Sequence, residues 1–119
     1  MGASEYKRVG KGKTAEVAFK NVGGGTDMGS YHGNIQCKPS CVEFPRPKGM
    51  RRATVIQAIN DLGRIRFDDD GNPKTDAVQA KYPKLRIAAM SEVYEDKWGP
   101  SLAIELAKGE YLFAGFASS

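Results

Sequence analysis

Hydrophobic and polar residues alternate in three stretches of the first half of the chain, the period-2 pattern of a strand with one buried face. In residues 14–20, Ala15, Val17 and Phe19 fall on one side. Residues 31–38 are predicted as the clearest strand, with Tyr31, Gly33, Ile35 and Cys37 on one side and His32, Asn34, Gln36 and Lys38 on the other. Residues 41–44 are predicted as a short third strand. Pro45 and Pro47 end it, because proline cannot donate to a ladder.

Apolar residues at helical spacing follow in residues 51–62. Val55, Ile56, Ile59 and Leu62 fit one helical stripe, and Gly63 stands where a glycine often ends a helix. The run of β-branched residues at 54–56 leaves a hairpin open as the alternative. We favour the helix, because four apolar positions share its stripe. Residues 68–73 are predicted as a turn in either case, since they are rich in Asp, Gly, Asn and Pro.

The last third of the chain is predicted to be mostly helical. Pro83 suits the first turn of a helix that reaches Trp98. Ser101 is a suitable N-cap for a second helix over residues 102–108, which Gly109 would end. Residues 111–116 are apolar on both faces and are predicted as a buried terminal strand.

These elements predict an α+β fold, in which a small antiparallel sheet of the N-terminal strands and a C-terminal strand packs against two or three helices. Residues 1–13 have no apolar periodicity and place Gly10 and Gly12 among basic residues, so they are predicted as a flexible basic N-terminal arm. Residues 14–119 are predicted as a single domain, since a chain of 119 residues is too short for two well-packed ones.

The composition points to a protein of the cytoplasm with no membrane partner. The longest uncharged apolar stretch, residues 111–117, is far shorter than the roughly 20 residues that cross a bilayer. The N-terminal residues lack the apolar run of a signal peptide. Cys37 and Cys41 are four residues apart, and a disulfide between them would close too small a loop to add much stability. We therefore expect both thiols to be reduced, as is usual in the cytosol.

Charge is distributed unevenly along the chain. Residues 1–66 carry twelve Lys and Arg against five Asp and Glu, a net charge of +7. Residues 67–119 carry six against nine, a net charge of −3. Such an asymmetry indicates an anionic partner for the basic half, most simply a nucleic acid.

Motifs for cofactors, metals and catalysis are incomplete, so none is predicted. The glycines at 23–25 lack the Gly-Lys-Ser/Thr ending and the helix that a phosphate loop needs. His32, Cys37 and Cys41 are soft enough ligands for zinc, but His32 and Cys37 would face opposite sides of a strand. The acidic turn at 68–72 lacks the Glu that completes a calcium loop. With one histidine and no paired carboxylates, the sequence offers no readable acid–base set for an enzyme.

The sequence therefore predicts a non-enzymatic nucleic-acid-binding protein, directed to single strands or to the phosphate backbone. The predicted phosphate contacts are Lys7, Arg8, Lys11, Lys13, Lys38, Arg46, Lys48, Arg51 and Arg52. Tyr31 or Tyr6 is the candidate platform for base stacking, although Tyr31 shares a face with Ile35 and fits the core equally well.

A second class of function remains open. A small regulatory or inhibitory protein that binds another protein, or a small anionic ligand, would have the same compactness and the same lack of a catalytic set. Its acidic C-terminal half would offer Glu92, Glu95 and Asp96 to a basic partner, and its basic half would accept an acidic protein surface. A homodimer through an exposed strand edge is a further expectation.

Overall fold

The computed structural model describes residues 3–26 and 33–118. Within them the chain forms four strands, four α-helices and one 3-10 helix. In chain order these are β1 (Ala3–Lys11), α1 (Ala15–Asn21), η1 (Ile35–Cys37), β2 (Cys41–Phe44), α2 (Arg52–Leu62), α3 (Asp76–Lys81), α4 (Ile87–Glu95), β3 (Ser101–Ala107) and β4 (Glu110–Ser118).

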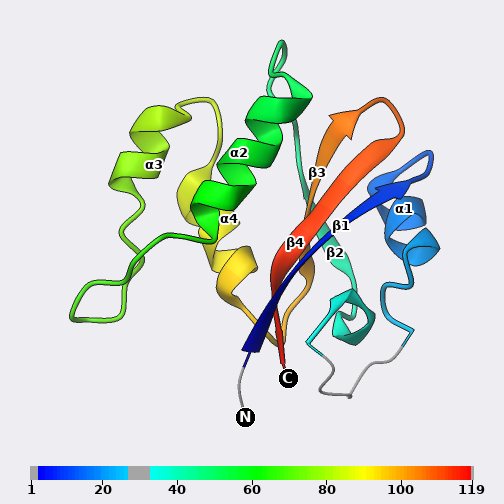
Figure 1. The fold of residues 1–119 in the computed structure, drawn as a ribbon, viewed down its shortest axis with the longest axis horizontal. Helices are drawn as coiled ribbons and strands as arrows, with labels where there is room; N and C mark the ends of the chain where they lie inside the picture. Colours follow the sequence, from blue (N-terminus) through cyan, green and yellow to red (C-terminus); the bar gives the residue numbers. More distant parts are fainter. Residues whose placement is uncertain (1–2, 27–32, 119) are drawn as a thin grey trace.

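The strands form one mixed sheet in the order β1-β4-β3-β2. β4 runs antiparallel to both β1 and β3, and it follows β3 through a tight turn in which Gly109 has a φ of 75°. β2 is parallel to β3, and helices α2, α3 and α4 make the connection between these two strands (Figure 1). The α+β class is thus confirmed, but the sheet is mixed rather than wholly antiparallel.

Helices cover both faces of the sheet, so its two middle strands are buried on both sides (Figure 1). On one face, Leu102 and Ile104 of β3 pack into a cluster with apolar residues of α2 and α4. On the other face, Phe113 of β4 meets Phe19 of α1 edge to face at 5.7 Å, and Ile35 of η1 belongs to the same cluster. The sheet is therefore the middle layer of three.

β1 replaces the flexible arm predicted for residues 1–13. All of Ala3–Lys11 pairs with β4, from Ala3 opposite Ser118 to Lys11 opposite Glu110. Two successive side chains of β1 also form hydrogen bonds on opposite faces of the sheet. The Glu5 carboxylate accepts from the Tyr94 hydroxyl of α4, and the Tyr6 hydroxyl donates to Ser101 Oγ of β3 at 2.7 Å. The prediction was wrong because a largely polar edge strand has no apolar periodicity to reveal it.

Two predicted strands of the first half are not strands. Residues 15–21 form α1, because Ala15, Ala18 and Phe19 are buried at helical spacing and Thr14 Oγ1 caps the helix by accepting the Val17 N–H. In the segment predicted as the clearest strand, residues 31–32 lie outside the described part, and residues 35–37 form the 3-10 helix η1. Asn34 Oδ1 caps η1 by accepting the Gln36 N–H at 2.9 Å.

The second half differs at β3, where a helix was predicted over residues 102–108. The residues of β3 favour helices by their intrinsic propensity. They form a strand because the burial of this apolar segment between the two helical layers outweighs that propensity. Helix α4 is also shorter than predicted, and α3 was not predicted. The strand at 41–44, the helix within 51–62 and the strand at 111–116 are confirmed, as is the turn after Phe67.

Replacing Gly10 with alanine tests whether β1 is docked. A Cβ at Gly10 would lie 2.7 Å from Val22 Cγ1 and 2.8 Å from the Ala18 carbonyl oxygen, so α1 would have to move. We expect Gly10→Ala to lower the free energy of unfolding by about 1–3 kcal/mol, the usual cost of overpacking, in urea titrations. The adjacent control Val9→Ala, at a side chain that is 46% exposed, should cost under about 1 kcal/mol. Equal stability of Gly10→Ala and wild type would contradict the docking of β1.

Candidate nucleic-acid interface

Cations from four segments of the chain gather at the end of the sheet that carries the β3–β4 turn, the upper end in Figure 1. β1 ends there at Lys11, β2 ends there at Phe44 opposite Ile104, and α2 begins there after the loop at 45–51. We call this region the basic end. Its cations are Lys11, Lys13, Arg46, Lys48, Arg51, Arg52, Lys84 and Lys108.

A hollow of about 390 Å³ at the N-terminus of α2 holds three of these cations. Lys48 and Arg51 precede the helix, Lys84 comes from the segment before α4, and Thr54 contributes a hydroxyl-bearing side chain from the first turn. α2 has no acidic residue in its first turn, and Arg51 at the N-cap position makes no side-chain capping bond. The unsatisfied N–H groups and the helix dipole thus add to the positive potential of the three side chains.

A second hollow, of about 580 Å³, lies between the β1–α1 connection and the β3–β4 turn. It is lined by Gly12, Lys13, Lys108 and Gly109, and the Gly12 N–H donates to the Gly109 carbonyl at 3.0 Å. That hydrogen bond holds the two lysine-bearing turns side by side.

Within the described ranges, two of the eight cations form ion pairs with carboxylates of the protein. Arg46 pairs with Glu105 at 3.0 Å, and Arg52 pairs with Glu110 at 2.8 Å. In the part of the chain that the structure describes, no carboxylate lies within ion-pair distance of Lys48, Arg51 or Lys84. The α2 hollow therefore gathers three cations that no described carboxylate compensates.

The other predicted contacts lie elsewhere. Lys7 and Arg8 are exposed halfway along β1 and, as successive strand residues, point to opposite faces. Tyr31 lies outside the described residues. Tyr6, the alternative stacking platform, is 7% exposed and belongs to the core, so it offers no face to a base. The aromatic side chains that are exposed in residues 3–26 and 33–118 include Phe67 and Trp98, both away from the basic end.

Lys38 was predicted as a phosphate contact and is instead buried, at 1% exposure, near the opposite end of the sheet. Its Nζ donates to the Asp96 carbonyl at the end of α4, at 2.7 Å, and lies 5.9 Å from the centre of the Tyr6 ring. Burial lowers the pKa of Lys38 to about 8, although Asp96 opposes the shift. The prediction failed because a Lys is normally assigned to the surface from sequence alone.

The two cysteines are half-buried and pack against the cluster on the α1 face of the sheet. Cys41 lines a separate hollow of about 410 Å³ beside Gly24 and Gly25, but burial raises the pKa of its thiol, as do Glu16 and Glu43. Among the described residues, which exclude His32, no three Cys, His, Asp or Glu side chains come together as metal ligands would.

Sequence reasoning missed Lys84 and Lys108. Both belong to the acidic half of the chain; Lys84 lies in a short basic stretch between Lys81 and Arg86, and Lys108 has no basic neighbour. Only the fold brings Lys84 beside Lys48 and Lys108 beside Lys13. The sequence alone does not place either lysine beside the basic residues of the first half.

Comparison of the chain with protein-family models, with curated proteins and with solved structures finds no match. None of the helices in the described ranges is long and apolar enough to cross a membrane. The site is therefore interpreted from its own geometry.

The buried amine of Lys38 predicts an unusual dependence of stability on pH. Between the folded pKa of about 8 and the ordinary value of 10.5, the unfolded chain binds one more proton, so stability rises with pH. We expect a gain of about 2 kcal/mol by pH 10. Above that, stability falls again, because burial raises the pKa of Tyr6 and of Tyr94 and keeps both phenols neutral in the folded protein.

Urea unfolding of Lys38→Met across this range checks the prediction. The variant should lack the rise above pH 8, whereas Lys74→Met, which removes an exposed lysine, should retain it. If the free energy of unfolding changes with pH in the same way in Lys38→Met and in the wild type, the Lys38 amine does not cause the rise in stability.

Proposed function

We propose that this protein binds nucleic acid without catalysis, through the phosphate backbone, at the basic end. The observation that carries the proposal is the hollow at the N-terminus of α2, where Lys48, Arg51 and Lys84 converge with no carboxylate of residues 3–26 or 33–118 within ion-pair distance. Three convergent cations at a helix N-terminus are suited to phosphate oxygens, which accept from side chains and backbone N–H groups alike.

The proposal is directed to the backbone rather than to bases. Stacking on Tyr6 would have favoured unpaired bases, but its ring is inside the core. The second hollow adds Lys13 and Lys108 along the same end of the sheet, which suits a chain of successive phosphates better than a single anion. We therefore expect the affinity to depend weakly on the nucleotide sequence and strongly on the salt concentration.

Titration of a fluorescent single-stranded oligonucleotide at increasing salt tests the proposal. Neutralising the hollow with Lys48→Gln, Arg51→Gln and Lys84→Gln together should weaken binding and reduce the slope of log K against log salt. Each lost phosphate contact on a single strand removes about 0.7 from that slope, so the triple variant should lose about 2.

The matched control removes the same charge elsewhere, through Lys20→Gln, Lys74→Gln and Lys97→Gln. It should keep the slope of the wild type. Equal losses of affinity and of salt slope in the two triple variants would mean that net charge alone drives binding. Binding of polyglutamate as tight as that of the oligonucleotide would favour an acidic protein partner and contradict the proposal.

A further inference from the structure

We infer that Arg46 is a positioning residue, which holds the loop at 45–50 in the shape that presents Lys48 and Arg51 to phosphate. The inference rests on the proposed function and concerns how its site is built. It also corrects the prediction from sequence, which treated Arg46 as a phosphate contact like its basic neighbours.

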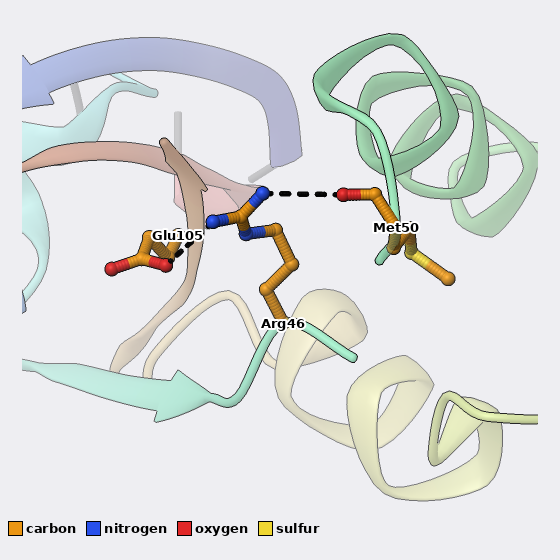
Figure 2. Close-up of polar contacts among 3 residues, drawn as sticks. All are labelled: Arg46, Met50 and Glu105. Carbon is orange, nitrogen blue, oxygen red and sulfur yellow. Dashed lines mark hydrogen bonds and ion pairs between the residues drawn. The ribbon is translucent and has the colours of Figure 1, made fainter. Parts of the chain in front are cut away.

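Both terminal nitrogens of the Arg46 guanidinium donate hydrogen bonds within the protein. Nη1 donates to the Met50 carbonyl at 3.2 Å, and Nη2 donates to Glu105 Oε1 at 3.0 Å (Figure 2). The first contact reaches across the loop to the residues just before α2, and the second fixes the loop to β3. Both side chains are about one-third exposed, at 29% for Arg46 and 32% for Glu105, so the pair is partly shielded from water.

The loop itself has the form of a closed turn. The Met50 N–H donates to the Pro47 carbonyl at 3.0 Å, and Gly49 has a φ of 82°, a conformation that glycine adopts without strain. Lys48 stands exposed at the tip of this turn, at the rim of the α2 hollow. Arg46 thus closes the base of a turn whose tip carries a candidate phosphate contact.

Removing the charge of Glu105 tests the inference, because the direction of the resulting change in affinity separates two accounts. A carboxylate close to a polyanion site repels the ligand, so removing its charge should strengthen binding if charge were all that mattered. If Glu105 acts through Arg46, its removal frees the guanidinium and loosens the loop, and binding should weaken instead. The two accounts predict changes of opposite direction.

The experiment compares Glu105→Gln, Arg46→Lys and Glu43→Gln in the oligonucleotide titration. We expect Glu105→Gln and Arg46→Lys each to weaken binding several-fold with the salt slope unchanged, since neither removes a phosphate contact. Arg46→Lys keeps the charge but not the planar fork that reaches two partners at once. Glu43→Gln removes a negative charge from the neighbouring strand β2 without touching the loop, and should bind as tightly as the wild type or slightly more tightly.

Amide hydrogen exchange at Met50 gives a readout that does not depend on ligand. Exchange should be faster in Glu105→Gln and Arg46→Lys, while the Tm stays near that of the wild type. Tighter binding by Glu105→Gln, full binding by Arg46→Lys, or unchanged exchange at Met50 would each overturn the inference. Absence of oligonucleotide binding by the wild type would instead overturn the proposed function, and exchange at Met50 would then decide whether the clamp exists.

Discussion

Antiparallel pairing of β1 with β4 is the constraint on which the rest of the structure depends. It places Lys11 beside the β3–β4 turn and sets the surface of β1 against which α1 packs at Gly10. The hydrogen bond from Tyr94 to Glu5 ties the strand to α4, and the one from Tyr6 to Ser101 ties it to β3 across the sheet. A largely polar segment is thereby held at the edge of the sheet through the buried Tyr6, and the cations at its end acquire fixed positions.

Sequence reasoning found α2 and the strand at 41–44 from their apolar periodicity, and β4 from a run that is apolar on both faces. Ala15, Val17 and Phe19 fit an alternating pattern, but the face that is buried is Ala15, Ala18 and Phe19, which only the tertiary packing selects. β3 was predicted as a helix because burial between two helical layers removes the alternation that marks a strand, while Ser101 and Gly109 flank its apolar run as helix boundaries would.

The candidate site was predicted in part, for a comparable reason. Cations in a basic run, such as Lys48 and Arg51, do lie at one end of the molecule. The sequence could not separate them from Arg46, which is paired with Glu105 and hydrogen-bonded to its own loop, or from Lys38, which is buried. Whether a cation is available to a ligand depends on its partners, and those partners come from distant segments of the chain.

Titration of the protein with a short single-stranded oligonucleotide, followed by the NMR shifts of its backbone amides, tests the central claim most directly. Phosphate bound at the basic end should shift the amides at residues 12–13, 48–54 and 108–110, with the largest changes in the first turn of α2, where N–H groups point toward the hollow. Shifts confined to the opposite end, around Trp98 and the start of β3, or no shifts at low salt, would contradict the account.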